Sequence, residues 1–319
     1  MYPLKLTGVT RSPLWSGDRL LKEWNKKSES ERIGESWELT VRADGMSTVA
    51  NGELAGKTLS EVLEHSGEEL MGKSRCDNGF PLLIKFIDAG DRLSVQVHPD
   101  DAYAARVEHD RGKTEMWYIV EAEEGAEIIC GLAEGETVET LRRAIERGEA
   151  ESVLCRIPVF AGESYFIPSG LPHAIGKGIL IAEIQQNCDL TYRLWDYLRL
   201  DKDGKPRELH VEKALDVIRP FSKEEIEALR CESPSERGRE ELLADCAYFC
   251  VEKITLGDAS RTLCTDERMG HLLCVGGKGE LCADGVTYPI LRGEGYLLPA
   301  KGNSVTLRGD GTFLFCIAK

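Results

Sequence analysis

The sequence predicts a mainly β protein built from two β-barrel domains with helical insertions. Most of the chain reads as strands of four to eight residues separated by turns rich in Gly, Asp and Asn, a pattern typical of barrels and sandwiches. The chain has 319 residues, which leaves room for about two domains of usual size. A short internal repeat supports the division into two barrels.

The repeat consists of GESYFIPSGLPH at 162–173 and GEGYLLPAKGNS at 293–304. In both copies a Gly is followed by five residues and then by a Pro. The first copy continues with Gly170 and His173, where the second has Lys301 and Ser304. We therefore expect two related barrels, of which only the first has kept a metal-binding histidine.

Three stretches have the periodicity and end signals of helices: 57–72, 136–154 and 210–231, the last interrupted by Pro220. We expect them to be insertions, at about 52–75, 134–154 and 208–231. The polar stretch 231–243 reads as a linker, and only strand signals follow it. The predicted domains are 1–235, which carries the insertions, and 236–319.

Composition limits the function classes. The formal net charge of −15 argues against binding to nucleic acid or to an anionic membrane, so a small molecule is the expected partner. The first residues lack the features of a signal peptide and no apolar run of membrane-spanning length occurs, so we expect a cytoplasmic location. The eleven cysteines include no Cys-x-x-Cys, which favours reduced, buried thiols over a thiolate zinc site.

Two histidines stand apart from the other four. In SVQVHPDD, Gln96 and His98 are two residues apart in an apolar strand and project to the same side. In IPSGLPHAIG, a turn stiffened by Pro and Gly fixes the direction of His173. His65, His109 and His210 have the charged surroundings of solvated side chains, and His271 has no acidic or histidine neighbour at strand spacing.

Glu115 completes a candidate metal site. It lies in the apolar strand KTEMWYIV, on the same face as Lys113 and Trp117, and a buried carboxylate needs a cation as partner. Together with His98, His173 and the amide oxygen of Gln96 it forms a set that favours zinc, although iron and manganese also suit these ligand types. Each residue alone has an ordinary structural explanation, such as a Glu–Arg ion pair.

The motifs also carry a resemblance. GDRLSVQVH (90–98) and GESYFIPSGLPH (162–173) resemble the two motifs of the cupin superfamily, with Gln96 in place of the first histidine. Gln-x-His-Pro, Lys-x-Glu-Met and Pro-x-Gly-x-Pro-His-Ala are similar to the type I mannose-6-phosphate isomerases. GESWELT (34–40) and QQNCDLTYRLWDY (185–197) are similar to the short, Bacillus-like branch of that family.

The resemblance implies two cupin-like jelly-roll barrels, a catalytic one and a degenerate C-terminal one, and one zinc ion per chain. It implies an aldose–ketose isomerase that interconverts mannose 6-phosphate and fructose 6-phosphate. His98, Glu115 and His173 match the zinc ligands of the family, and Gln96 matches a fourth ligand of its longer members. Arg193 matches a catalytic arginine, and Lys85 and Lys113 match lysines that line the site.

The chemistry accounts for these residue types. Isomerisation moves a proton between C1 and C2 through an enediol, so it needs a base and a cation near the two sugar oxygens. Glu183, on the strand that follows His173, and Asp189 at its end are the candidates for acid–base work or for contacts to sugar hydroxyls. Lys85, Lys113 and Arg193 are the expected contacts of an anionic substrate, and Lys113 and Arg193 are also catalytic candidates.

Three alternatives remain open at this point. The chain could isomerise another sugar phosphate, or it could be a sugar-phosphate-binding paralogue without activity, although such a paralogue is expected to lack a ligand or the arginine. A metal dioxygenase would more naturally carry a full His-x-His, so Gln96 counts against it. We expect a monomer or a weak homo-oligomer.

Overall fold

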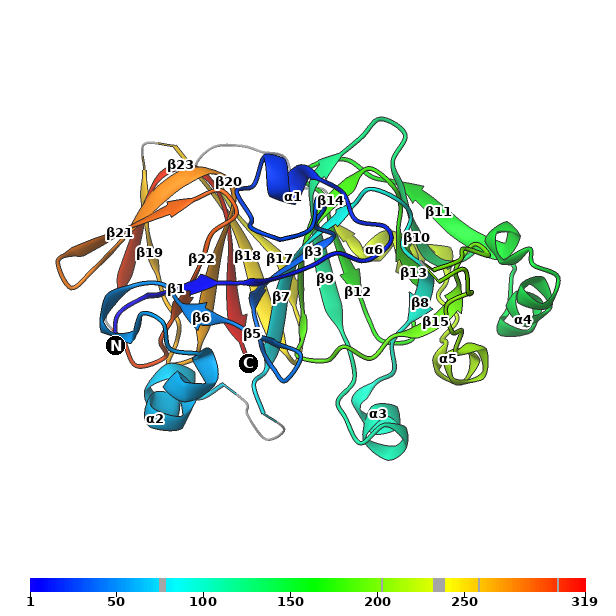
Figure 1. Ribbon diagram of the computed structural model, residues 1–319, viewed down its shortest axis with the longest axis horizontal. Coiled ribbons are helices and arrows are strands. Elements are labelled where there is room, and N and C mark those ends of the chain that lie inside the picture. Colours follow the sequence, from blue (N-terminus) through cyan, green and yellow to red (C-terminus); the bar gives the residue numbers. More distant parts are fainter. Residues whose placement is uncertain (75–78, 202, 232–238, 258, 303) are drawn as a thin grey trace.

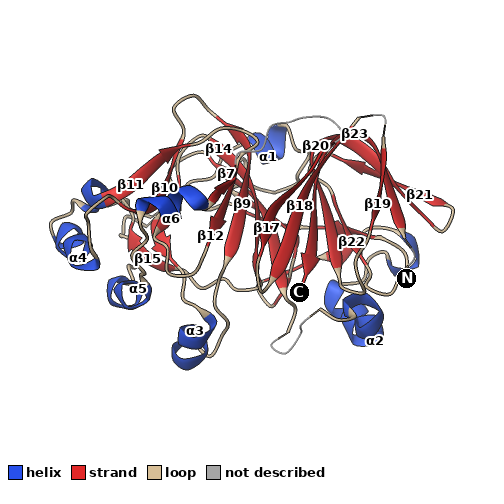
Figure 2. Ribbon diagram, turned by 180° about the vertical axis from the view of Figure 1, so that it is seen from behind, coloured by secondary structure: helices blue, strands red, loops and turns tan. Residues whose placement is uncertain are grey.

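The computed structural model describes residues 1–319 except 75–78, 202, 232–238, 258 and 303. The protein is mainly β, as predicted, and its strands form two groups that lie side by side with the helices at the periphery (Figures 1 and 2). The predicted boundary between residues 235 and 236, most of the predicted linker and the end of the first predicted insertion lie outside the described residues. The division at this boundary stays a prediction.

The first group consists of two sheets that face each other. The seven-stranded sheet has the order β16 (Arg230–Cys231), β12 (Ser164–Ile167), β9 (Glu115–Ala122), β14 (Ile179–Gln186), β7 (Leu82–Ala89), β3 (Glu35–Leu39) and β2 (Val9–Arg11). The five-stranded sheet has the order β11 (Leu154–Pro158), β10 (Glu127–Leu132), β13 (His173–Ile175), β8 (Val95–Val97) and β15 (Tyr192–Trp195). The small pair β4 (Val41–Arg42) and β5 (Gly45–Met46) follows β3 along the chain.

The second group is a nine-stranded sheet that includes the N-terminus of the chain. Its main path is β17 (Arg239–Asp245), β18 (Phe249–Leu256), β23 (Val305–Ala318), β20 (Gly270–Ala283), β22 (Gly295–Leu298), β1 (Leu4–Thr7) and β6 (Thr48–Val49), with β19 (Ser260–Leu263) beside β23 and β21 (Val286–Leu291) beside β20. Strand β1, near the start of the chain, therefore pairs with β22, near its end (Figure 1).

The seven-stranded sheet is buried on both faces, and its side chains alternate accordingly. On β7, Ile84 and Phe86 belong to the core shared with the nine-stranded sheet, whereas Ile87 belongs to the core between the two sheets of the first barrel. Lys85 projects to that same interior side. Because both faces are buried, β7 and β14 read as continuous apolar runs, and the polar residues among them stand out as interior groups.

Helices cover the outside of the barrels. α4 (Val138–Glu146) and α5 (Val211–Val217) pack on the outer face of the five-stranded sheet, where Leu141 and Leu215 join one core. α2 (Leu59–Met71) begins with a capping box of Thr58 and Glu61. α6 (Lys223–Ala228) follows α5 after the predicted break at Pro220, and the remaining helices are α1 (Arg19–Lys22), α3 (Asp101–Val107) and the short 3₁₀ turns Gly52–Leu54 and Ala150–Val153.

The predicted helices are confirmed with shorter bounds, and two were missed. The segment predicted as one helix over 136–154 is α4, a turn and a 3₁₀ helix. The interpretation of nearly all the rest as strand was wrong at α1 and at α3, where Asp100 caps the helix by accepting a hydrogen bond from the backbone N–H of Tyr103.

The ten described cysteines are all free, and four of them are buried. In the described part of the chain no helix has the length and apolarity needed to cross a membrane.

Candidate metal centre and active site

Three of the predicted metal ligands meet inside the first barrel. His98 follows β8, Glu115 begins β9 and His173 begins β13, so each comes from a different strand. The Nε2 atom of His98 lies 3.5 Å from one carboxylate oxygen of Glu115, and the Nε2 atom of His173 lies 3.4 Å from the other. The three potential ligand atoms lie within 4.8 Å of one another, and all three residues are buried.

Backbone carbonyls orient both imidazole rings. The Nδ1 atom of His98 lies 2.8 Å from the carbonyl oxygen of Leu190, and that of His173 lies 2.8 Å from the carbonyl oxygen of Leu171. If each Nδ1 carries the proton and donates it, each Nε2 keeps a free lone pair. Among the residues that the structure describes, neither Nε2 atom has a hydrogen-bond partner. Trp117 packs edge-on against the His173 ring, with the centroids 5.4 Å apart.

The buried environment keeps both imidazoles neutral. Burial, reinforced by the nearby charge of Lys113, lowers the pKa of His98 well below its ordinary value. Burial also lowers the pKa of His173 to about 4. A neutral imidazole is the form that binds a metal, so both rings are ready to act as ligands at neutral pH.

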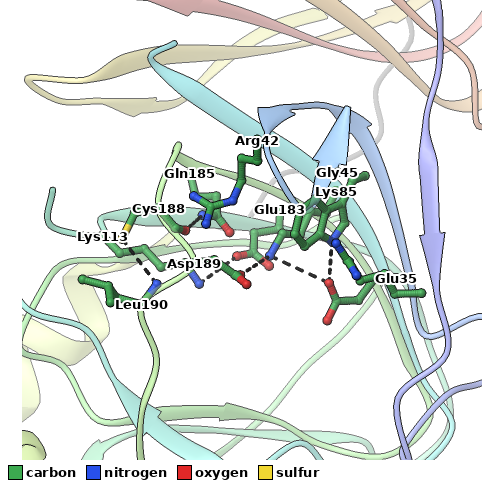
Figure 3. Close-up of polar contacts among 12 residues, drawn as sticks. Glu35, Arg42, Gly45, Lys85, Lys113, Glu183, Gln185, Cys188, Asp189 and Leu190 are labelled. Atoms are coloured by element: carbon green, nitrogen blue, oxygen red, sulfur yellow. Dashed lines mark hydrogen bonds and ion pairs between the residues drawn. The ribbon is translucent and has the colours of Figure 1, made fainter. Parts of the chain in front are cut away.

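Two buried lysines and a second buried glutamate adjoin the cluster. The Nζ atom of Lys113 lies 2.9 Å from Glu115 and 3.5 Å from Glu183, so one ammonium group bridges two carboxylates. Figure 3 shows Glu183 between Lys113 and Lys85. Burial would lower the pKa of Lys113, but Glu115 and Glu183 outweigh it and raise the pKa above its ordinary value. Burial, and next the charge of Glu115, raise the pKa of Glu183 to about 7.

Lys85 lies beside the predicted Asp189. Its Nζ atom lies 3.6 Å from a carboxylate oxygen of Asp189 and 3.9 Å from one of Glu35. The side chain of Lys85 is 5% exposed, whereas that of Asp189 is 41% exposed. Burial lowers the pKa of Lys85, but the charges of Glu183 and Glu35 outweigh it, so the net shift is upward. Lys85 is thus a buried cation whose two carboxylate partners reach the surface.

Gln96 and Arg193 lie next to the cluster on adjoining strands. Gln96 is opposite His173 on one neighbouring strand and opposite Arg193 on the other. Arg193 donates hydrogen bonds to the hydroxyl of Ser94 (3.3 Å) and to the carbonyl of Glu208 (2.7 Å). Metal binding by the Gln96 amide and substrate contact by Arg193 stay predictions.

Asp189 and Asp196 lie close to Arg193 in the sequence, but each interacts with other cations. Asp196 accepts hydrogen bonds from Arg207 (2.7 Å to Nε) and from Arg199 (2.5 Å). Asp189 faces Lys85 instead. Burial, and next the charge of Arg207, lower the pKa of Arg193. The Arg193 guanidinium is therefore a half-buried cation among other cations, a setting that favours an anionic ligand.

Sequence reasoning did not identify Glu35 and Trp37 as site residues, although both lie close to the Lys85 ammonium group. They are two residues apart on β3, and the indole N–H of Trp37 donates to Glu35 over 2.6 Å. Their alternate spacing was visible, but their nearness to Lys85 depends on the pairing of β3 with β7, which no local pattern reveals.

Comparison with known proteins decides the family. Residues 5–142 match the model of the catalytic domain of type I phosphomannose isomerase, and residues 239–317 match the model of the mannose-6-phosphate isomerase cupin domain. The mannose-6-phosphate isomerase ManA of Bacillus subtilis is 41% identical over 308 residues, which cover 96% of each chain. The chain belongs to the type I phosphomannose isomerase family.

Further relatives agree with this assignment. A mannose-6-phosphate isomerase of Streptococcus mutans is 47% identical over 217 residues, which cover 68% of this chain and 67% of the relative. The crystal structure of the mannose 6-phosphate isomerase from Bacillus subtilis superposes with a TM-score of 0.88 at 35% identity, and the match covers 99% of both chains. The predicted family, the cupin-type fold and the assignment as an isomerase are confirmed. The roles of the individual site residues stay predictions.

Proposed function

We propose that this protein interconverts mannose 6-phosphate and fructose 6-phosphate at the buried site around His98, Glu115 and His173. The observation that carries the proposal is the convergence of these three residues with Lys113 and Glu183 in a chain of this family. The site combines a place for a metal ion, a carboxylate for proton transfer and cations for an anionic sugar.

We propose further that one zinc ion per chain binds His98, Glu115 and His173, with Gln96 as the fourth ligand. The donor set fits, because two neutral imidazoles with free Nε2 atoms and a carboxylate form one buried cluster. Charge fits as well, because Glu115 and Glu183 share the Lys113 ammonium group and Glu35 and Asp189 share that of Lys85, so carboxylates outnumber ammonium groups at the site. When bound, zinc would polarise the sugar oxygens at C1 and C2 and stabilise negative charge on them.

Glu183 is the proposed base. Its carboxylate is 3% exposed and lies 3.5 Å from the Lys113 ammonium, so it is held in one place and removed from water. The pKa of about 7 in the metal-free protein lies in the range that suits a group that both accepts and returns a proton. In this proposal Glu183 removes the proton from C2 of mannose 6-phosphate, which leaves the enediol, and returns it to C1 to give fructose 6-phosphate. Lys113 stabilises the ionised carboxylate of Glu183.

The remaining residues recognise the substrate. The protein as a whole is strongly acidic, with a net charge of −15, so a phosphorylated sugar needs local cations. Lys85, Lys113 and Arg193 are the proposed source of that charge, and the partly exposed Asp189 is the proposed contact for a sugar hydroxyl.

A coupled assay tests the proposal by measuring formation of fructose 6-phosphate from mannose 6-phosphate. We expect turnover with mannose 6-phosphate and none with mannose, which lacks the phosphate. Turnover restricted to another sugar phosphate would show that the site serves a different substrate, and binding without turnover would identify a non-catalytic paralogue. The cytoplasmic location and the monomeric or weakly associated state also remain predictions.

A further inference from the structure

Trp37 lies directly behind Lys85. The two residues are opposite each other on the paired strands β3 and β7. The Nζ atom of Lys85 lies 5.0 Å from the centroid of the Trp37 ring system, within the range of a cation–π contact. Trp37 is 1% exposed, and Lys85 is similarly buried. The indole and the ammonium group thus meet in a region with little water, where such a contact is strongest.

The indole itself is fixed from several sides. Its N–H donates a 2.6 Å hydrogen bond to Glu35. A Cβ atom added at Gly45, which lies on β5, would come within 2.9 Å of the ring, so the backbone of β5 packs closely against it. The guanidinium of Arg11 covers the ring with its Cζ atom 4.4 Å from the centroid. The ring therefore has little freedom to tilt or slide.

The contact matters because of the nature of a lysine side chain. Lysine carries a compact charge on a flexible stem of four carbons, so its ammonium group has no fixed position of its own. Glu35 and Asp189 attract that charge from 3.9 and 3.6 Å, distances that leave several geometries open. The fixed ring of Trp37 adds a third neighbour, with its centroid 5.0 Å from the ammonium nitrogen. Glu35 interacts with both partners, because it accepts the hydrogen bond of the Trp37 indole and attracts the Lys85 ammonium group. Figure 3 shows the contact between Glu35 and Lys85.

We propose that Trp37 is a positioning residue that holds the Lys85 ammonium group where it meets an anionic oxygen of the substrate. This inference rests on the proposed function, in which Lys85 contacts the sugar phosphate. Trp37 acts through Lys85 and does not itself reach the reacting atoms. Its removal should weaken substrate binding while the metal cluster, to which it makes no described contact, stays intact.

The test compares Trp37→Leu and Trp37→Phe with the matched pair Trp24→Leu and Trp24→Phe. Trp24 is also buried and also carries a cation, with the Arg292 guanidinium 4.9 Å from its ring, but it packs against Phe86 in the core between the barrels. For each variant we would measure kcat and KM with mannose 6-phosphate, the dissociation constant of mannose 6-phosphate by calorimetry, the bound zinc and the melting temperature.

For Trp37→Leu we expect KM and the dissociation constant to rise about threefold to thirtyfold, as the strength of a desolvated cation–π contact implies. The change in kcat should be smaller, and zinc content should be that of the parent. Trp37→Phe should recover part of the loss, because phenylalanine keeps a ring face for the ammonium group. The Trp24 variants should lose thermal stability but keep the parental KM.

A double-mutant cycle with Lys85→Met separates positioning from a general packing role. If Trp37 acts through Lys85, Trp37→Leu should raise the dissociation constant in the parent and leave it unchanged in the Lys85→Met background. An equal rise in both backgrounds, or a rise in KM that the Trp24 variants share, would overturn the proposal. Calorimetric binding keeps the test valid if the parent binds mannose 6-phosphate without turning it over, a result that would refute the proposed isomerase activity alone.

Discussion

Replacing Lys113 by methionine should affect the metal-free and the metal-loaded protein differently. The Lys113 ammonium lies 2.9 Å from Glu115 and 3.5 Å from Glu183, and the three side chains are 4%, 1% and 3% exposed. Removing one partner of a buried ion pair costs about 3–5 kcal/mol, because the other charge stays buried without compensation. We expect the metal-free variant to lose that much free energy of unfolding.

In the zinc-loaded protein the loss should be smaller, because in our account the zinc ion compensates Glu115. By thermodynamic linkage, the difference between the two losses must appear as tighter zinc binding by the variant. A difference of about 2 kcal/mol corresponds to about thirtyfold in the dissociation constant.

Denaturant unfolding, in chelator and in saturating zinc, measures both losses, and competition with a chromophoric chelator measures the zinc affinity. Lys253→Met is the matched control, because Lys253 is 1% exposed and pairs with Glu241 at 2.8 Å in the nine-stranded sheet. It should lose the same free energy with and without zinc. If Lys113→Met also behaves in this way, or binds zinc no more tightly than the parent, zinc does not compensate Glu115 and the reasoning fails.

Three further predictions concern other residues. Glu183→Gln should lower kcat at least about a hundredfold, the usual effect of losing a general base, while the zinc content stays unchanged. Full turnover by this variant would eliminate Glu183 as the base. Asp88→Ala should lower the free energy of unfolding, measured by denaturant titration, by about 3–5 kcal/mol. The reason is that the buried Asp88 accepts two 2.8 Å hydrogen bonds, from the backbone N–H and from the Nε of Arg19. A loss below about 1 kcal/mol, the size expected for a surface ion pair, would contradict this. Burial lowers the pKa of His271 to about 3, so between that pH and its ordinary pKa the unfolded chain binds a proton that the folded chain does not. The free energy of unfolding should therefore fall progressively below about pH 6.5, by about 2 kcal/mol at pH 5. In a plot of unfolding free energy against pH, His271→Leu should flatten this decline, whereas the control His65→Gln, at an exposed histidine, should leave it unchanged.

The meeting of His98, Glu115 and His173 could be predicted from the sequence because its signals are local. His98 stands at the end of a short strand, Glu115 interrupts an apolar strand, and Pro and Gly fix the turn before His173. Each of these patterns depends on a few neighbouring residues and on the alternation of side chains along a strand. The convergence of the three could be inferred because a barrel interior collects the inward residues of several strands.

Other features could not be predicted because they depend on pairing between distant segments. Strand β1 joins the nine-stranded sheet through Leu4 opposite Leu297, a choice that no pattern near Leu4 encodes. The contact between Trp37 and Lys85 likewise follows from the register of β3 against β7. Helix α3 was missed for a different reason: it has only seven residues, too few to establish a helical period next to strand-like neighbours.

The most direct test of the central claim is removal and return of the metal. The protein would be treated with a chelator, dialysed and assayed for conversion of mannose 6-phosphate, and then titrated with zinc while both bound metal and turnover are measured. Our account predicts that activity disappears with the metal and returns in proportion to bound zinc, reaching its maximum at one ion per chain. Full activity in the stripped protein, or zinc binding at that stoichiometry without any turnover, would contradict the account.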